Sequence, residues 1–273
     1  MAGFFIVKFY QYIQILSIDV VAGACITSLF ISEVLSINVS YKGILCLAIC
    51  VWLIYTVDHI RDGKRTEKPS SKRHQFHKRY AKLLLYIVGV ISVLGVFLLP
   101  TLHPKLLIYG VILLLAVGVY FTLISFTPLK NFKEPMVALL YTFGVLACPL
   151  SVDLGQNRLT LIAVGSFIFF AALINLLFLS LKEFEQDIID GHASMVVKLG
   201  KGNAYRLLLL ILILNVFPII YLVTINQLFL LVFGLMELVL ALLTVYSKRF
   251  NNEFTYRFLG DAVFVIPIVY FLV

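Results

Sequence analysis

Two clusters of carboxylates hold the side chains whose types and spacing could do chemistry in this chain. Asp58 and Asp62 end an apolar stretch that reads WLIYTVDHIRDGKR. The second cluster follows a later apolar stretch, in SLKEFEQDIIDGHAS, and comprises Glu183, Glu185, Asp187 and Asp190. Residues four apart share one face of a helix, so Asp58 with Asp62, and Glu183 with Asp187, form two pairs of the same spacing.

These pairs are electrostatically unfavourable by themselves and need a positive partner. Like charges four residues apart repel, and carboxylates at the C-terminal end of a helix face the negative end of its dipole. Nearby lysines and arginines could compensate them in solvated, salt-bridged loops. Alternatively, the pairs face one another and hold Mg²⁺, which binds through one or two carboxylates together with phosphate oxygens and water. The matching spacing favours the Mg²⁺ site, provided that the fold places both clusters on the same side.

The elements that must position these carboxylates are membrane-spanning helices. Of the 273 residues, 62% are hydrophobic and 13% are charged, with a mean hydropathy of +1.03, whereas soluble domains are about 45–50% apolar and about 25% charged. This composition excludes a soluble enzyme, a disordered chain and a disulfide scaffold. It predicts an all-α, polytopic membrane protein in which residues 1–273 form a single domain.

Long apolar runs predict a single bundle of nine transmembrane helices. They lie near 10–32, 42–60, 83–100, 106–127, 135–152, 159–179, 207–224, 227–246 and 258–273. The connections are mostly short, and the two exceptions, 61–82 and 180–206, are polar and adjoin the carboxylate clusters.

The lysines and arginines predict the orientation of the bundle. Nineteen of the 22 fall on the side that holds the N-terminus and both long loops. The positive-inside rule makes this side cytoplasmic, so both carboxylate clusters are expected at the cytoplasmic face. The net charge of +8 is interpreted as this signal, with attraction to anionic membrane lipids, and not as nucleic-acid binding, because the basic residues lie in juxtamembrane loops.

With these motifs in these places, the chain resembles the UbiA superfamily of intramembrane prenyltransferases, which have nine transmembrane helices. Members carry Asn-x-x-x-Asp-x-x-x-Asp after the second helix and Asp-x-x-x-Asp after the sixth. Here the first motif has Asp58 and Asp62 in place, with Ile54 at the asparagine position. The second motif has Glu183 and Asp187, with glutamate replacing the first aspartate.

A third similarity lies between the fourth and fifth predicted crossings. There SFTPLKNFKEP is similar to the Tyr-Thr-Pro-Leu-Lys-Arg stretch of the family, whose basic residue contacts the diphosphate. That residue corresponds to Lys130, and the following arginine is replaced by Asn131. Gly191, Ser194 and the segment MVVKLG at 195–200 also follow in an order similar to that of the family.

The resemblance implies a Mg²⁺-dependent enzyme that transfers a prenyl group from a prenyl diphosphate to a lipophilic acceptor such as an aromatic ring. Asp58, Asp62, Glu183 and Asp187 would be the catalytic metal ligands, and Lys130 would neutralise the diphosphate. Two alternatives stay open. One is an intramembrane terpene cyclase of the same type, in which the substrate's own double bonds capture the cation. The other is a non-catalytic membrane protein that binds an isoprenoid or a partner.

Other polar residues lie within the predicted crossings, where an ionisable group is costly and usually faces a polar cavity. Asp19 is expected to line a pocket, beside small residues at 22–25 that permit close helix packing. Asn175, about two turns before Glu183, makes either an interhelical hydrogen bond or a substrate contact. We count Asp19, Asn175 and Asp190 with Lys130 as candidate substrate-binding residues. Glu237 and Asp261 either line the same cavity or pair with basic residues near the membrane edge.

His74 and His77, in KRHQFHKRY, have a spacing that could suit a metal ion. Four basic residues surround them and would repel a cation. We therefore expect this segment to face lipid headgroups or a diphosphate.

Overall fold

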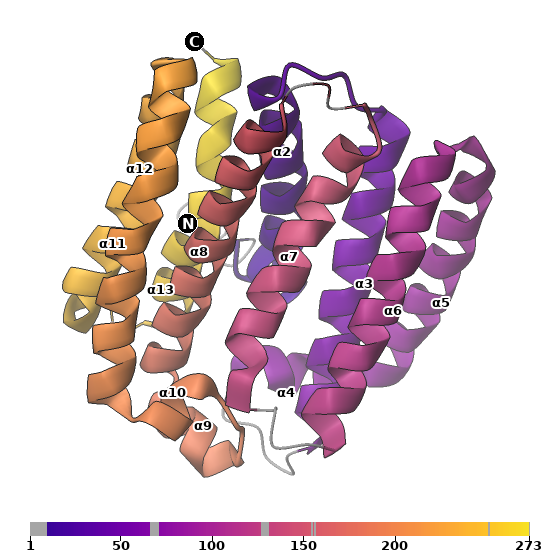
Figure 1. The fold of residues 1–273 in the computed structure, drawn as a ribbon. Helices are drawn as coiled ribbons and strands as arrows, with labels where there is room; N and C mark the ends of the chain where they lie inside the picture. The colour runs from indigo at the N-terminus through magenta and orange to yellow at the C-terminus, as the bar shows by residue number, and fades with distance from the viewer. Residues whose placement is uncertain are drawn as a thin grey trace, which may run out of the picture.

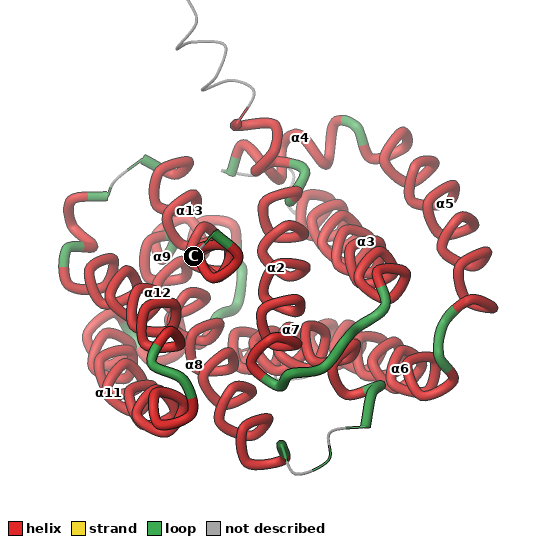
Figure 2. Tube along the Cα trace, turned by 90° about the horizontal axis from the view of Figure 1, so that it is seen from above, coloured by secondary structure: helices red, strands yellow, loops and turns green. Residues whose placement is uncertain are grey.

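The computed structural model describes residues 10–65, 71–126, 131–153, 155, 157–250 and 252–272. These residues are almost entirely helical and contain no strand, which confirms the predicted all-α fold. The long helices run side by side and form a bundle (Figures 1 and 2).

Nine long helical segments make up the described part of the bundle. They are α2 (Ile18–Val34), α3 (Tyr41–Arg65), α5 (Ala81–Leu98), α6 (Pro104–Phe126), α7 (Lys133–Leu150), α8 (Arg158–Lys182), α11 (Lys201–Ile225), α12 (Leu228–Val245), and α13 (Glu253–Ala262) continued by the 3₁₀ segment η4 (Val263–Phe271). Shorter elements connect them: α4 (Lys72–Arg79), α9 (Phe184–Asp190), α10 (Met195–Leu199), η1 (Leu99–Thr101) and η3 (Ser247–Arg249).

Seven of these segments are long and apolar enough to cross a membrane, so the chain is an integral membrane protein. The two others are α2, which has 17 residues, and α7, which carries Lys133 and Glu134 in its first turn. Both lie within the bundle alongside the spanning helices (Figure 2). That both also cross the bilayer stays a prediction.

The core of the bundle lies around α8, which packs against α7 and α11 and also contacts α12 and α13. Its side chains Phe167 and Ile174 are fully buried, and the ring of Phe167 lies 4.7 Å from that of Phe233 on α12. In contrast, α5 and α6 leave many of their apolar side chains exposed. In a bilayer such surfaces face lipid chains, so the burial pattern agrees with an interior built on α8.

The helix at the first predicted crossing, α2, begins later than the sequence predicts. Ser17 adopts a left-handed backbone conformation, with φ at 56°, and this breaks the chain between the helical turn at 10–15 and α2. Asp19 therefore lies in the first turn of α2 and not in the middle of a crossing. Within α2, Gly23 lets η4 approach: a Cβ at Gly23 would lie 3.0 Å from Cβ of Phe264.

The two long polar connections lie at the same end of the bundle. In Figure 1 α4 lies at the lower end together with α9 and α10. The prediction that segments 61–82 and 180–206 share one side is therefore confirmed for their described helices. That this end is cytoplasmic stays a prediction.

Candidate functional site

The first carboxylate pair ends α3, which extends as far as Arg65. Asp62 is buried, and Asp58 is half-buried one turn earlier. The two carboxylates repel one another electrostatically, and Lys133 in the first turn of α7 offsets part of this repulsion. The compensation that the sequence required comes first from this lysine on another helix, and Arg61 of α3 and Arg73 of α4 act in the same direction.

The second pair lies where α8 ends and α9 begins. Glu183 forms an ion pair with Arg257 of α13 and accepts a hydrogen bond from the Tyr256 hydroxyl at 3.3 Å. Asp187 lies one turn later and faces Nδ1 of His192 at 3.9 Å. Burial raises the pKa of Asp187 to about 7, and Lys133 acts against this rise. Lys133 is thus within electrostatic range of Asp58, Asp62 and Asp187.

Among the described residues, no group of three or more His, Cys, Asp or Glu side chains is close enough to enclose a metal ion. An all-protein cage is not what Mg²⁺ needs, because it usually keeps waters and binds one or two carboxylates together with phosphates. Asp58, Asp62 and Asp187 offer carboxylates for such a site, and all three lie within electrostatic range of Lys133. Glu183 is committed to Arg257 and Tyr256, so its role as a metal ligand stays a prediction that this pairing does not favour.

Glu134 holds the segment that carries the second pair. It is 1% exposed and accepts a hydrogen bond from the Ser180 hydroxyl at 2.8 Å. The backbone N–H of Met195 donates to both of its carboxylate oxygens, at 3.1 and 3.0 Å. One side chain on α7 therefore ties α8 to the start of α10, on either side of Asp187.

Four histidines form a chain of ring contacts beside the carboxylates. The ring centroid of His59 lies 5.1 Å from that of His77 and 5.9 Å from that of His74, and His74 lies 5.8 Å from His192. Burial lowers the pKa of His74 to about 2 and that of His77 to about 4, so both rings are neutral at pH 7.

That the segment KRHQFHKRY faces headgroups or a diphosphate stays a prediction, but the ring of His77 does not lie on its outer surface. Its side chain is 1% exposed, and its Nδ1 lies 2.9 Å from the carbonyl oxygen of Arg73. The helix α4 turns this ring into the protein instead of toward the membrane surface.

A cavity of about 100 Å³ lies in the interior of the bundle. Its polar lining comes from five elements: Tyr55 of α3, Arg73 of α4, Tyr141 of α7, Asn175 of α8, and Arg257 with Asp261 of α13. The remaining wall is apolar. Arg257 is already paired with Glu183, whereas the described residues give the Arg73 guanidinium no ion pair and its Nε no hydrogen bond.

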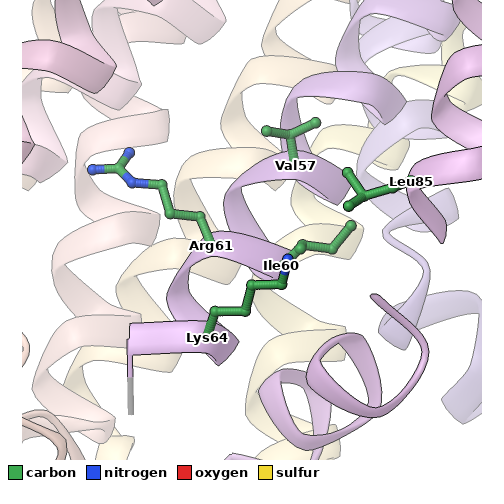
Figure 3. Close-up of a pocket in the computed structure, with 5 residues that line it drawn as sticks. All are labelled: Val57, Ile60, Arg61, Lys64 and Leu85. Atoms are coloured by element: carbon green, nitrogen blue, oxygen red, sulfur yellow. The ribbon is translucent and has the colours of Figure 1, made fainter. Parts of the chain in front are cut away.

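A second, open groove of about 390 Å³ lies on the outside, between α3 and α5. Figure 3 shows its lining residues, with the side chain of Arg61 extending away from Leu85. Arg61 donates to the carbonyl oxygen of Phe121 on α6 at 3.4 Å, and its guanidinium lies 5.1 Å from the centre of the Phe121 ring. Apart from Lys64, the rest of this lining is apolar, as expected of a surface in contact with lipid chains.

The predicted substrate-binding residues differ in where the structure places them. Asn175 lines the cavity and is 4% exposed. Asp19 has one oxygen on the N–H of Val20 at 3.0 Å and lies within electrostatic range of Arg73 and Arg257. Asp190 ends α9, and its role in substrate binding stays a prediction. Lys130 lies outside the described residues.

Asp261 and Glu237, for which the sequence allowed either a place in the cavity or a basic partner, have different surroundings in the structure. Asp261 lines the cavity. Glu237 does neither of the things expected of it: it accepts a hydrogen bond from Asn215 of α11 at 2.7 Å, far along the chain from any motif.

Sequence reasoning missed Lys133, Glu134, Arg73 and Arg257 as site residues. Lys133 and Glu134 directly follow the SFTPLKNF stretch that was singled out for Lys130, so a search of the neighbouring positions could have found them. Arg73 belongs to the segment KRHQFHKRY, which was expected to face headgroups or a diphosphate, whereas Arg257 carried no local signal, because its significance arises from Glu183, 74 positions away.

Two solved structures share this fold. A UbiA homolog from Archaeoglobus fulgidus, bound to GPP and Mg²⁺, matches with a TM-score of 0.66 and 13% identity, over 96% of this chain and 100% of that chain. A digeranylgeranylglyceryl phosphate synthase matches with a TM-score of 0.56 and 16% identity, over 97% of this chain and 96% of that chain. No family model matches the sequence, and no curated protein does.

This chain therefore has the fold of the UbiA homolog and of the digeranylgeranylglyceryl phosphate synthase. This confirms the fold that the motif resemblance implied. At 13–16% identity the similarity establishes the fold of the chain.

Proposed function

We propose that this protein is a Mg²⁺-dependent intramembrane prenyltransferase that transfers a prenyl group from a prenyl diphosphate to a lipophilic acceptor. The observation that carries the proposal is that Asp58, Asp62 and Asp187, which come from both motifs, lie within electrostatic range of Lys133 at one end of an apolar bundle. The GPP and Mg²⁺ bound to the Archaeoglobus fulgidus homolog give the ligand classes that such a site suits.

Asp58, Asp62 and Asp187 are the residues proposed to hold Mg²⁺ with the diphosphate. When bound, Mg²⁺ would supply charge neutralisation of the leaving diphosphate. Glu183 would join them only by exchanging its ion pair with Arg257.

The cations of the chain itself bind and orient the diphosphate. Arg73 has no ion pair among the described residues, and its Nε has no hydrogen bond, although Glu183, Asp261 and Glu253 lie within electrostatic range of it. An anionic ligand would supply the direct partner that this cation lacks.

Lys133 lies within electrostatic range of Asp58, Asp62 and Asp187, and Lys130 is proposed as the third cation by its motif. Positive charge at the oxygens of the leaving group stabilises them most as the C–O bond breaks.

The apolar helices protect the prenyl carbocation after the diphosphate has left. Loss of diphosphate from an allylic donor leaves a carbocation that water would capture, and the buried wall of the bundle excludes water from it. The aromatic rings of Tyr55, Tyr141 and Phe264 line the interior cavity of about 100 Å³ and present π-faces to a cation.

The orientation and the membrane partners belong to this proposal. The end with α4, α9 and α10 is assigned to the cytoplasm, because the lysines and arginines concentrate there. A water-soluble diphosphate head would then reach the site from the cytoplasmic side, while its prenyl chain and the acceptor come from the membrane lipids.

The test is a donor assay on purified protein with geranyl diphosphate. We expect diphosphate release that requires Mg²⁺, and a loss of at least 100-fold in Asp58→Asn and in Asp187→Asn, which change the ligand with little change in volume. Asp153→Asn, an exposed carboxylate at the other end of the bundle, is the matched control and should retain activity. Release that survives both site variants, or that ignores removal of Mg²⁺, refutes the proposed site.

The same assay separates the alternatives. A prenylated acceptor indicates a transferase, a cyclic hydrocarbon formed without acceptor indicates a cyclase, and binding of geranyl diphosphate without release indicates a non-catalytic protein.

A further inference from the structure

Arg257 lies between two carboxylates that belong to different parts of the chain. Its guanidinium forms an ion pair with Glu183, at the junction of α8 and α9, and its Nε lies 3.7 Å from Oε1 of Glu253, one turn earlier on α13. Arg257 is buried, with 8% of its surface exposed. Asp261 also lies within electrostatic range of it. Because a guanidinium presents its N–H groups in fixed directions, Arg257 constrains the positions of the two carboxylates that it contacts.

Two hydrogen bonds extend this contact to a third element. The hydroxyl of Ser71, directly before α4, donates to Oε1 of Glu253 at 3.0 Å, and the hydroxyl of Tyr256 donates to Oε1 of Glu183 at 3.3 Å. Ser71 and Tyr256 are both buried. We call Ser71, Glu183, Glu253, Tyr256 and Arg257 the α13 clamp. It joins the start of α4 and the junction of α8 and α9 to the first turns of α13.

The two segments that the α13 clamp holds carry residues of the candidate site. Arg73 comes two residues after Ser71, and Asp187 comes one turn after Glu183. The proposed function assigns Arg73 to the diphosphate and Asp187 to Mg²⁺. Contacts that fix both segments on one helix therefore set the distance between these two groups.

The energetics of the α13 clamp bear on whether Glu183 also binds the metal ion. Moving this carboxylate to Mg²⁺ would break a buried ion pair and leave the Tyr256 hydroxyl without its acceptor, which is strongly destabilising. An ion on the other oxygen of Glu183 would lie beside the guanidinium, and the two cations would repel each other. Mg²⁺ needs one or two carboxylates besides phosphate oxygens and water, and Asp58, Asp62 and Asp187 already offer three.

We propose that Glu183 is a positioning residue that holds Arg257 in the α13 clamp, and that it does not bind the metal ion, although it occupies a ligand position of the second motif. The α13 clamp fixes α4 and α9 on α13, and it thereby places Arg73 and Asp187 for the diphosphate and Mg²⁺. The inference rests on the proposed function for the roles of Arg73 and Asp187. The ion pair itself is tested independently, by protein stability.

Titration of a donor analogue separates positioning from metal binding. Binding of geranyl S-thiolodiphosphate, which resists ionisation, is measured at saturating Mg²⁺, and the Mg²⁺ concentration that gives half-maximal binding is measured separately. Glu183→Gln should weaken binding of the analogue about tenfold, because Arg257 loses its charged partner, and should leave the half-maximal Mg²⁺ concentration within about twofold. Asp187→Asn removes a proposed ligand and should raise that concentration at least about tenfold.

A second substitution should rescue the first. Adding Arg257→Gln to Glu183→Gln removes the unpaired cation and leaves two amides that can hydrogen-bond to each other. Binding of the analogue should then return to within about threefold of the unaltered protein, and the thermal midpoint that Glu183→Gln lowers should recover. The exposed pair of Glu185 and Lys201 is the matched control. Glu185→Gln, alone or with Lys201→Gln, should change binding less than about twofold.

Three results overturn the inference: an increase in the half-maximal Mg²⁺ concentration in Glu183→Gln as large as that in Asp187→Asn, a double variant that binds the analogue no better than Glu183→Gln, or unchanged binding in Glu183→Gln. If Glu183→Gln does not fold, the double variant decides alone. An unchanged Mg²⁺ requirement then supports the inference, whereas a raised requirement or a failure to fold overturns it.

Failure of the proposed function gives a different result. If the unaltered protein binds the analogue without Mg²⁺, or does not bind it, the proposed function is refuted. The thermal midpoints then decide whether Glu183 and Arg257 form the α13 clamp: a lower midpoint in Glu183→Gln that the double variant restores supports it, and equal midpoints refute it.

Discussion

Lys133 is the side chain whose surroundings most constrain the chemistry of the site. Three carboxylates from two different motifs lie within its electrostatic range. Two explanations fit this position. Either the lysine balances charge so that the carboxylates can be buried together, or it also binds a phosphate oxygen of the donor.

Substitution of Lys133 distinguishes these roles. Lys133→Ala should weaken binding of geranyl diphosphate by about 10- to 100-fold, because a hydrogen bond to a charged group contributes about 1.5–3 kcal/mol. Lys133→Arg should retain part of the affinity, since the charge persists. Lys42→Ala, at the opposite end of the bundle, serves as the control.

A second ligand completes this test. If Lys133 binds a phosphate oxygen, Lys133→Ala should weaken binding of geranyl diphosphate and leave binding of geraniol, which has no phosphate, unchanged. If the lysine only balances charge, the unbalanced carboxylates disturb the site and both ligands should weaken together. Titration of both ligands against each purified variant decides between the two.

Contacts between helices position the residues of the site, and Gly260 lies at a close contact between α13 and α8. A Cβ at this position would overlap Oδ1 of Asn175, so the absence of a side chain at Gly260 is what lets α8 lie against α13 beside the cavity. Asn175 on α8 and Asp261 on α13, on the two sides of this contact, both line the interior cavity.

Gly260→Ala should therefore disturb the cavity although it adds a single methyl group. Asn175 must move, which overpacks a well-filled contact at a cost of about 1–3 kcal/mol. We expect a lower thermal midpoint and a loss of donor binding. Gly89→Ala on α5 is the control: nothing lies within 4 Å of a Cβ there, and alanine favours the helix. Equal behaviour of the two variants would show that this contact does not shape the cavity.

Glu134 performs a comparable task for the segment that carries Asp187. Glu134→Ala leaves the Ser180 hydroxyl and the Met195 N–H without their partner, and each unsatisfied buried group costs about 1–3 kcal/mol. The thermal midpoint should fall by about 5–10 °C. Glu185→Ala removes an exposed ion pair with Lys201, which contributes little, so its midpoint should stay within about 2 °C. A shift as small for Glu134→Ala would contradict this role.

The long helices and the two motifs were predictable from the sequence because both are local signals. Apolar runs mark the crossings, and a spacing of four places Asp58 and Asp62 on one face. The partners of Glu183 were not predictable, because the pairing with Arg257 depends on how α13 packs against α8. The break at Ser17 was also missed, since a left-handed residue at a serine leaves no mark in an apolar pattern.

At the scale of the whole molecule, the short connecting helices and most of the basic residues belong to the same end of the bundle. The short helices α4, α9 and α10 and the candidate site lie at one end of the bundle (Figure 1). Most lysines and arginines belong to segments at that end, and they would face the anionic inner leaflet if it is cytoplasmic. The orientation therefore decides whether a water-soluble diphosphate reaches the site from the cytoplasm.

Accessibility labelling tests this orientation directly. In a variant whose four cysteines are replaced by serine, single cysteines are introduced at Lys72, Gly202 or Tyr41, which are all exposed. Lys72 and Gly202 lie in α4 and at the start of α11, and Tyr41 begins α3 at the other end. In intact cells an impermeant maleimide should label Tyr41→Cys alone, and after permeabilisation all three. Labelling of Lys72→Cys in intact cells would invert the assigned orientation, and opposite behaviour of Lys72→Cys and Gly202→Cys would contradict the shared end on which the candidate site depends.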